Sequence, residues 1–402
     1  MSDRLPDAIV QTAQTRIVFV VMDGLGGLPD PATGRTELET ARTPNLDRIA
    51  RDASAGLGMP VGRGITPGSG PGHLALFGYD PIEFNIGRGV LSALGIDFPL
   101  RAGDIAARLN FATLDGAGNI VDRRAGRPND EENARLVEKL RAGVKPPAGI
   151  ELYFESEREH RLVLILRGEN LSADLSDTDP QKTGVPPLPV TPTGEMSRGS
   201  ARIVQSVIDA CNDVLRDESA ANGVLARGFA AFSRYPSISD RYLMSARAIA
   251  RYPMYRGLAR LLGMEVLPPP ATDEQTIDVL ADGFGSADFH FVHFKYMDSR
   301  GEDGDFGAKV EAIEKVDALF PRIEALKPDV LVVTGDHSTP SRMRAHSWHP
   351  VPVLLASKWT RPAGLEAFGE RDCLRGDLGI FPMKDLMALI LANARRLQKF
   401  GA

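Results

Sequence analysis

Short runs of consecutive apolar residues, each closed by a polar residue, are the main pattern along the chain. Val330–Val333 is the clearest of them, and the runs at 16–22 and 289–294 repeat it. Runs of roughly four to eight such residues are typical of strands buried on both faces of a parallel sheet. Segments with apolar residues at helical spacing, such as 201–216, lie between them. The pattern predicts an α/β fold with a mostly parallel central sheet and helices on both of its faces.

Aspartates follow these three runs. Asp23 comes directly after the first run in the chain, Asp298 shortly after the second, and Asp336 shortly after the third. His337 adjoins Asp336, and His346 follows nine residues after His337. Because open α/β sheets bind ligands at the carboxyl ends of their strands, we expect these side chains at one edge. Carboxylates with imidazoles suit Zn²⁺ or Mn²⁺ better than Mg²⁺, although an aspartate that caps a turn is an equally simple interpretation.

A glycine-rich segment at 62–78 surrounds a single serine, Ser69. Glycines allow a close approach of the backbone and leave amide groups exposed, as at an anion site on a helix N-terminus. Activation of this hydroxyl by divalent metal ions for phosphoryl transfer would explain the serine, the aspartates and the histidines together. A flexible turn that happens to contain a serine is the simpler alternative.

The pattern changes from about residue 101. A strand at 104–114 is followed by a cluster of three arginines within 122–127. The planar guanidinium suits bidentate binding of phosphate or carboxylate, although a solvated charged turn is the commoner explanation of such a cluster. A return to the first domain is expected between about residues 225 and 245.

Composition limits the possible partners and locations. A chain of 402 residues is long enough for two domains, and its 43% hydrophobic and 25% charged content is that of a globular protein. The net charge of −6, without a long basic run, argues against nucleic acid as a partner. Cys211 and Cys373 are too few for a disulfide framework. Without a signal-peptide pattern or an apolar run of about 18 residues, we expect a cytoplasmic protein that does not bind membranes. The oligomeric state is not predicted.

Together these segments resemble the cofactor-independent (2,3-bisphosphoglycerate-independent) phosphoglycerate mutases of the archaeal type, within the alkaline phosphatase superfamily. The matching segments occur in order through most of the chain: Val20–Gly24, Thr43–Asp47, Pro67–Ser69, His73–Leu74, Gly78–Pro81, Gly87–Gly89, Asn110–Thr113, Asp122–Arg127, Ser176–Pro180, Leu261–Met264, Thr334–Pro340 and His346–Ser347.

The resemblance implies an alkaline-phosphatase-like core with an inserted cap. The core would comprise residues 1–100 and 233–402 and bind metal, and a smaller α+β cap, residues 101–232, would bind substrate. The implied reaction interconverts 3-phosphoglycerate and 2-phosphoglycerate through a phosphoserine on Ser69. The implied partner is a small phosphorylated carboxylic acid.

The resemblance also implies two divalent metal ions, Mn²⁺ or Zn²⁺, with Mg²⁺ as a further option. The residues implied for the first ion are Asp23, Ser69, Asp336 and His337. Those for the second ion are Asp298 and His346, to which we add Glu302 as a predicted ligand, because glutamate can bind the same metals. The candidates for substrate binding are His73, Asn110, Arg123, Arg124, Arg127 and Arg227.

Several positions depart from the family pattern. Glu302 stands where the family has a histidine, Gly70 where it has an aspartate, and Ser245 near the place of an expected lysine; we expect all three at the active site. His349, in place of an aspartate, is an alternative ligand to Glu302. Because a hydrolase need only admit water, a metal-dependent phosphohydrolase or phosphotransferase on another small phosphorylated or phosphonylated acid stays open. The retained Ser69 argues against a third option, a non-catalytic binding protein.

Overall fold

The structure, a computed structural model, describes residues 7–84, 86–362 and 364–401. It divides into two compact units, which comprise residues 1–85 with 236–402, and residues 86–235. The second unit begins before residue 101, the boundary suggested by the sequence, because helix α4 (Arg88–Gly95) packs on strands of this unit. The division leaves open which unit binds metal and which binds substrate, and that assignment stays a prediction.

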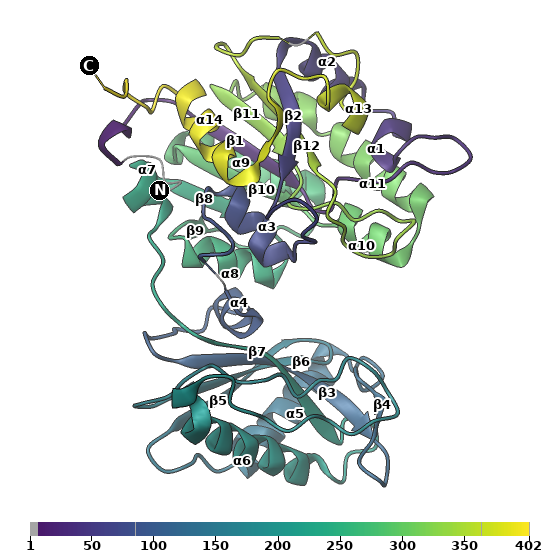
Figure 1. The fold of residues 1–402 in the computed structure, drawn as a ribbon, viewed down its shortest axis with the longest axis vertical. Helices are drawn as coiled ribbons and strands as arrows, with labels where there is room; N and C mark the ends of the chain where they lie inside the picture. The colour runs from purple at the N-terminus through teal and green to yellow at the C-terminus, as the bar shows by residue number, and fades with distance from the viewer. Residues whose placement is uncertain (1–6, 85, 363, 402) are drawn as a thin grey trace. The chain divides into compact units, whose positions relative to one another are not determined.

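An eight-stranded sheet forms the centre of the first unit, in the order β13-β2-β12-β11-β1-β10-β8-β9 (Figure 1). Five of its seven strand pairs are parallel, and β12 runs antiparallel to both of its neighbours. The predicted mostly parallel sheet is therefore confirmed. The strands are β1 (Ile17–Met22), β2 (Ser54–Met59), β8 (Ala246–Ile249), β9 (Glu265–Val266), β10 (Phe289–Phe294), β11 (Val330–Thr334), β12 (Val351–Ser357) and β13 (Gly379–Pro382).

The three central strands, β1, β10 and β11, are buried along their whole length. Side chains alternate between the two faces of a strand, so complete burial requires that both faces are covered. Phe19 of β1 shows the packing, with ring contacts to Phe77 and Phe289 at centroid distances of 6.0 and 5.8 Å. Burying each such side chain stabilises the fold by roughly 1.5–3 kcal/mol. This is why these strands appear in the sequence as continuous apolar runs.

Helices cover both faces of this sheet, as predicted (Figure 1). One layer contains α2, α9, α11 and α12, and the other contains α3, α8 and α14. No helix in the described part of the chain is long and apolar enough to cross a membrane. The helices of the first unit are α1 (Glu37–Thr40), α2 (Pro44–Asp52), α3 (Ser69–Leu76), α7 (Ile238–Tyr242), α8 (Pro253–Leu261), α9 (Asp273–Gly283), α10 (Tyr296–Asp303), α11 (Phe306–Asp317), α12 (Phe320–Glu324), α13 (Glu370–Cys373) and α14 (Leu386–Asn393), with short 3-10 turns at Asp7–Ile9, Phe284–Ser286 and Met383–Asp385.

The second unit has an antiparallel five-stranded sheet, in which β4, β3, β6 and β5 are consecutive neighbours and β7 also pairs with β3. One face packs on two helices around a core that includes Phe111, Leu136, Phe154 and Val207. This α+β composition agrees with the predicted fold class. The elements are β3 (Ile105–Leu114), β4 (Ile120–Asp122), α5 (Asp130–Gly143), β5 (Glu151–Arg158), β6 (Arg161–Arg167), a 3-10 turn (Glu195–Ser197), α6 (Arg198–Leu215) and β7 (Gly223–Ala231).

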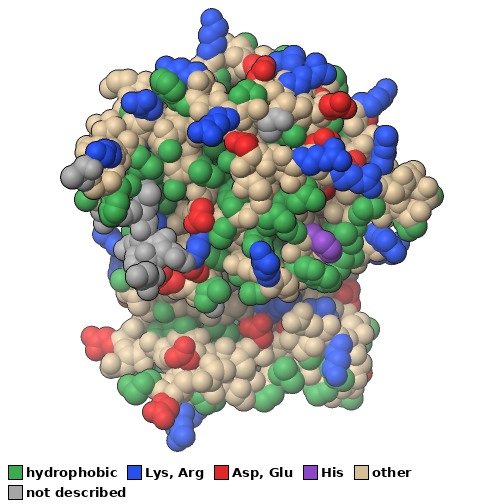
Figure 2. Space-filling view, turned by 45° about the horizontal axis from the view of Figure 1, so that its top comes forward, with side chains coloured by type: hydrophobic (Ala, Val, Ile, Leu, Met, Phe, Trp, Pro, Cys, Tyr) green, Lys and Arg blue, Asp and Glu red, His purple; other side chains and the backbone are tan. Residues whose placement is uncertain are grey.

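The surface of the first unit carries charges of both signs. On the face shown in Figure 2, lysine and arginine side chains are spread among acidic and hydrophobic ones.

Candidate active site

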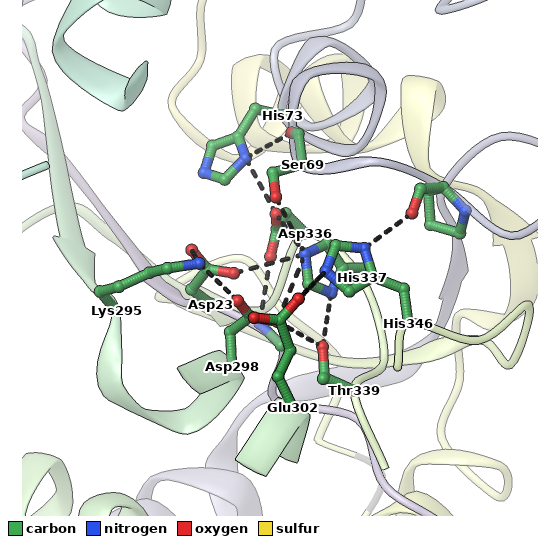
Figure 3. A network of polar contacts seen from close by, with 12 residues as sticks. Asp23, Ser69, His73, Lys295, Asp298, Glu302, Asp336, His337, Thr339 and His346 are labelled. Carbon is green, nitrogen blue, oxygen red and sulfur yellow. Dashed lines mark hydrogen bonds and ion pairs between the residues drawn. The ribbon is translucent and has the colours of Figure 1, made fainter. Parts of the chain in front are cut away.

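Polar side chains from the ends of β1, β10 and β11 meet at the carboxyl edge of the larger sheet (Figure 3). Asp23 directly follows β1, Asp298 lies in the first turn of α10 after β10, and Asp336 follows β11. The first and last have no exposed surface, and Asp298 is only 2% exposed. Parallel neighbours end at the same edge, so the register of three strands brings these carboxylates together.

The first group of possible metal-ligand atoms comes from Asp23, Asp336 and His337, whose atoms all lie within 4.8 Å of one another. His337 Nε2 is 3.4 Å from Asp23 Oδ1 and 3.2 Å from Asp336 Oδ2. Neither of these buried oxygens has a hydrogen bond of good geometry to any described residue. A buried carboxylate oxygen without a well-aligned donor is costly, and a cation bound among these atoms would compensate that cost. The donor set, two carboxylates and an imidazole, therefore fits a divalent ion.

The second group comes from Asp298, His337 and His346, so His337 belongs to both groups. Nδ1 of His346 donates to the carbonyl of Pro67 at 2.9 Å, which directs Nε2 toward Asp298 Oδ1, 3.3 Å away. Burial disfavours the charged imidazole of His346, but the bond to Asp298 outweighs it and raises the pKa of His346 to about 9. An ion that binds this nitrogen must displace its proton.

Glu302 and His349 lie outside both groups. The carboxylate of Glu302 is 3.8 Å from His346 Nε2, and its side chain is 57% exposed. His349 is paired with the Ser347 hydroxyl at 3.0 Å and stacks on Trp348. Of the two predicted alternatives, Glu302 thus lies beside the second group. Its place as a ligand stays a prediction.

Ser69 is the first residue of α3, and its Oγ lies 3.3 Å from His337 Nε2. The N-terminus of a helix carries unpaired N–H groups and a partial positive charge, which favour an anion beside the serine. The helix can come this close only because residue 72 is glycine. A Cβ on Gly72 would lie 2.4 Å from the carbonyl oxygen of Asp336.

Two buried histidines lie behind the carboxylates. His73 Nδ1 is 2.9 Å from the Ser69 carbonyl and 3.1 Å from Asp336 Oδ2. We predicted that His73 contacts substrate, but it is 0% exposed, so this location suits support of Asp336 instead. His293, which the sequence analysis missed, pairs with Asp23 Oδ2 at 3.2 Å. Its only signal in the sequence is that it is one of two histidines, with His290, in an otherwise apolar strand.

Lys295 and Thr339 are two further residues that the sequence analysis missed. The ammonium of Lys295 donates to Asp298 Oδ2 and lies 3.1 Å from Asp23 Oδ2. Burial alone would raise the pKa of Asp23, but Lys295 and then His293 outweigh it and hold that pKa well below its usual range. Thr339 contacts both Asp298 and a ring nitrogen of His337.

Ser245 does not lie at this site, which corrects our expectation. It precedes β8, and its hydroxyl and N–H both donate to Asp288, which precedes β10. Because β8 and β10 are parallel, Ser245 is at the amino edge of the sheet, opposite the carboxylates. Gly70 is next to Ser69 at the start of α3, as expected.

The predicted arginines of the second unit differ in their surroundings. Arg123 donates two hydrogen bonds to Asp179, at 2.9 and 2.7 Å, and Arg227 lies 3.6 Å from the same carboxylate. Arg124 and Arg127 are exposed in the turn after β4. The two exposed side chains are open to a ligand, whereas the other two already share a carboxylate.

Arg108, which was not predicted, stands directly opposite Arg227 in the β3–β7 pair. The Nε atoms of both are buried and make no hydrogen bond within the described chain, and the same is true of Asn110 Oδ1. Burial, opposed by Glu157, and nearby arginines together lower the pKa of Arg108 to about 10. Like charges directly opposite each other destabilise a sheet, so an anion bound here would be stabilising.

The fold and the site together define a class: an α/β protein with a serine and two carboxylate–imidazole groups at the carboxyl edge of its sheet. A family model described as "2,3-bisphosphoglycerate-independent phosphoglycerate mutase" matches residues 50–221. The chain is 49% identical over 397 residues to a probable 2,3-bisphosphoglycerate-independent phosphoglycerate mutase from Thermus thermophilus, with 98% of each chain covered. A relative of the same name from Deinococcus radiodurans is 46% identical over 410 residues, with 100% of each chain covered.

Two solved structures are similar over almost the whole chain. A Pyrococcus horikoshii protein matches with a TM-score of 0.84 and 28% identity, over 97% of this chain and 100% of that one. A cofactor-independent phosphoglycerate mutase from Thermoplasma acidophilum matches with a TM-score of 0.70 and 28% identity, over 94% and 100%. The chain belongs to the 2,3-bisphosphoglycerate-independent phosphoglycerate mutase family, which confirms the resemblance stated from its motifs.

Proposed function

We propose that this protein interconverts 3-phosphoglycerate and 2-phosphoglycerate through a phosphoserine on Ser69, without a bisphosphoglycerate cofactor. One observation carries the proposal within this family: Ser69 Oγ is 3.3 Å from His337 Nε2, the imidazole common to both groups of metal-ligand atoms. The hydroxyl at the start of α3 is the nucleophile, and the helix terminus stabilises the phosphoryl oxygens. A cytoplasmic location, expected from the sequence, stays a prediction.

Two divalent ions, Mn²⁺ or Zn²⁺, with Mg²⁺ as a further option, are part of this proposal. The residues that would hold the first are Asp23, Ser69, Asp336 and His337. Those for the second are Asp298, His346 and, at its exposed side, Glu302. When bound, the ions would lower the charge on the phosphoryl oxygens and favour the ionised serine.

The substrate would be a small phosphorylated carboxylic acid held by residues of the second unit. Arg124 and Arg127 are exposed and can form bidentate hydrogen bonds with a carboxylate or phosphate. Asn110, Arg227 and Arg108 each have a buried polar atom that makes no hydrogen bond within the described chain. This supports all three as further contacts to the substrate. Arg123 would contribute to substrate binding indirectly, because it holds Asp179 through a hydrogen bond.

The test is incubation of the metal-loaded protein with 3-phosphoglycerate, followed by ³¹P NMR of the products. Formation of 2-phosphoglycerate without inorganic phosphate is expected, and Ser69→Ala should abolish it while the circular dichroism spectrum is unchanged. Acid quenching should trap a phosphoserine only in the protein that retains Ser69. Absence of 2-phosphoglycerate with both Mn²⁺ and Zn²⁺ would refute the proposal.

A metal-dependent phosphohydrolase is the second candidate function. Its support is the exposure of Glu302 beside the second ligand group and the absence of a charged side chain at Gly70. Solvent access at Glu302 and the small residue beside the serine would both make it easier for water to enter the site. Release of inorganic phosphate from 3-phosphoglycerate in the same experiment would favour this candidate over the mutase.

A further inference from the structure

The hydroxyl of Thr339 contacts two of the candidate metal ligands, Asp298 and His337 (Figure 3). Its oxygen is 2.7 Å from Asp298 Oδ1 and 2.9 Å from Nδ1 of His337. Thr339 is 0% exposed, so water does not compete for either hydrogen bond. The hydroxyl therefore joins the imidazole that both groups share to a carboxylate that belongs to only one of them.

The direction of the two hydrogen bonds follows from the number of protons. An ionised carboxylate can only accept, so the single hydroxyl proton of Thr339 is donated to Asp298. The oxygen then accepts from His337, which requires the imidazole proton to be on Nδ1. Nε2 consequently keeps its lone pair, and it is this atom that faces Asp23 Oδ1 and Asp336 Oδ2. A metal ligand must present such a lone pair.

We propose that Thr339 is a positioning residue for phosphoryl transfer. It selects the His337 tautomer that can bind a cation through Nε2, and it fixes the angle between that ring and Asp298. The inference rests on the proposed function, since it is the proposed metal ions that need the lone pair. Thr339 acts through His337 and Asp298 and does not touch the reacting atoms itself.

The backbone of Thr339 is held firmly enough for this role. Its N–H donates to the carbonyl of Gly26 at 3.0 Å. Its own carbonyl accepts from the ammonium of Lys309 at 2.9 Å, and the same ammonium donates to Gly26 at 3.0 Å. Lys309 is 0% exposed, and a Cβ on Gly301 would lie 2.1 Å from the Thr339 carbonyl oxygen. The hydroxyl is thus presented from a backbone with little freedom to shift, as positioning requires.

Thr334 provides a matched control in the same segment. It is also 0% exposed, and its hydroxyl donates to the carbonyl of Pro352 at 2.9 Å. It contacts no candidate metal ligand through that bond. Thr334→Val therefore measures what the loss of one buried hydroxyl hydrogen bond costs the fold, on the order of 1 kcal/mol, without affecting His337 directly.

The experiment compares Thr339→Val, Thr339→Ser and Thr334→Val. Mn²⁺ binding to metal-free protein is followed by electron paramagnetic resonance of the free ion. Thr339→Val should bind Mn²⁺ about 10- to 100-fold more weakly, as for other lost partners of metal-bound histidines. Thr339→Ser retains the hydroxyl and should restore binding, and Thr334→Val should lose stability but not Mn²⁺ affinity.

The second measurement reports the tautomer directly. In metal-free protein labelled with ¹⁵N-histidine, long-range ¹H–¹⁵N spectra should show His337 protonated at Nδ1 in the wild type and in Thr339→Ser. Thr339→Val should lose that signature. A wild-type His337 protonated at Nε2 would overturn the proposal even if the valine variant does not fold, and so would wild-type Mn²⁺ affinity in folded Thr339→Val.

Neither measurement uses a substrate, so the proposed mutase function and the proposed positioning role of Thr339 can fail separately. If the wild type forms no 2-phosphoglycerate but Thr339→Val loses the tautomer and the Mn²⁺ affinity, the phosphoglycerate assignment is wrong and the positioning role stands. If 2-phosphoglycerate forms and Thr339→Val binds Mn²⁺ as the wild type does, the mutase assignment stands and the positioning role is wrong.

Discussion

Replacing Gly72 with alanine tests whether catalysis depends on the close approach of α3 to the loop after β11. A Cβ at this position would lie 2.4 Å from the carbonyl oxygen of Asp336, whereas real Cβ contacts essentially never fall below 3.0 Å. The helix and the loop must therefore separate by at least the difference, about 0.6 Å, since overpacking moves the backbone when no flexible side chain can yield. Ser69 lies at one end of that helix and His337 adjoins Asp336, so the separation acts on the 3.3 Å distance between Ser69 Oγ and His337 Nε2.

The magnitude follows from the size of this shift. A misplacement of about 1 Å can lower a rate by about 100-fold, so a shift of roughly 0.6–1 Å predicts a loss of about 10- to 100-fold in kcat. The clash should also cost about 1–3 kcal/mol of stability. In an uncrowded helix, glycine to alanine would instead stabilise by about 1 kcal/mol, so the sign of the stability change separates the clash from helix propensity.

The assay is formation of 2-phosphoglycerate from 3-phosphoglycerate at saturating metal, with urea unfolding for stability. Gly199→Ala in α6 is the matched control, because a Cβ there meets nothing within 4 Å. It should keep the wild-type kcat and match or exceed the wild-type stability. A folded Gly72→Ala protein with the wild-type kcat would refute the idea that the position of α3 controls the reaction.

Lys295→Met removes an ammonium that contacts Asp23 and Asp298, so kcat should fall more than about tenfold. Lys295→Arg keeps a positive charge and should recover part of kcat. A wild-type kcat in Lys295→Met would contradict this role. Burial raises the pKa of Glu370 to about 7 from 4.5. The folded protein therefore holds a proton that the unfolded chain has released, and stability from this group should fall by up to about 3 kcal/mol as pH rises from about 4.5 to 7, then stay level. Glu370→Gln should remove this fall in the free energy of unfolding between about pH 4.5 and 7, as measured by urea unfolding. If the free energy of unfolding of the wild type and of Glu370→Gln depends on pH in the same way, Glu370 does not titrate in this range. A chelator should abolish 2-phosphoglycerate formation, and added Mn²⁺ or Zn²⁺ should restore it with no change in helix content; activity that survives chelation would exclude a metal requirement. Burial raises the pKa of Cys211 and of Cys373, so a thiol reagent should modify them only after denaturation, and rapid modification of folded protein would disprove this.

The buried strands were predictable because burial on both faces of a strand requires apolar residues at nearly every position. Val330–Val333 and the run at 289–294 are apolar at every position except for histidines, and the structure forms β11 and β10 there. Neighbouring parallel strands end at the same edge of a sheet. Because Asp23, Asp298 and Asp336 each follow such a strand in the sequence, we could expect them to lie close together. Ser69 could be proposed because its glycine-rich setting and the family match at Pro67–Ser69 point to the same residue.

The supporting residues were not predictable because their roles depend on pairings between distant segments. Lys295 has no distinctive neighbours in the sequence, and it matters only because β1 and β10 pair in the register that brings Asp23 within 3.1 Å of its ammonium. Thr339 is one hydroxyl among many until the loop after β11 reaches α10. Ser245 differs from the expectation because its place in the sequence carries no information on strand direction, and the direction of β8 puts it at the amino edge of the sheet.

Charge explains why the site combines protein cations with proposed metal ions. Asp23, Asp298 and Asp336 are at most 2% exposed, so their three negative charges are removed from water. Taking a carboxylate out of water costs several kcal/mol unless it is paired. Lys295 supplies one formal positive charge to this set, and His346, with its pKa raised to about 9, despite burial, by Asp298, supplies a second only until a metal ion displaces its proton. His293 contributes a hydrogen bond to Asp23. Two divalent ions would reverse the balance to a net positive one, and an arriving phosphoryl group, itself an anion, would then be the favoured ligand of the site.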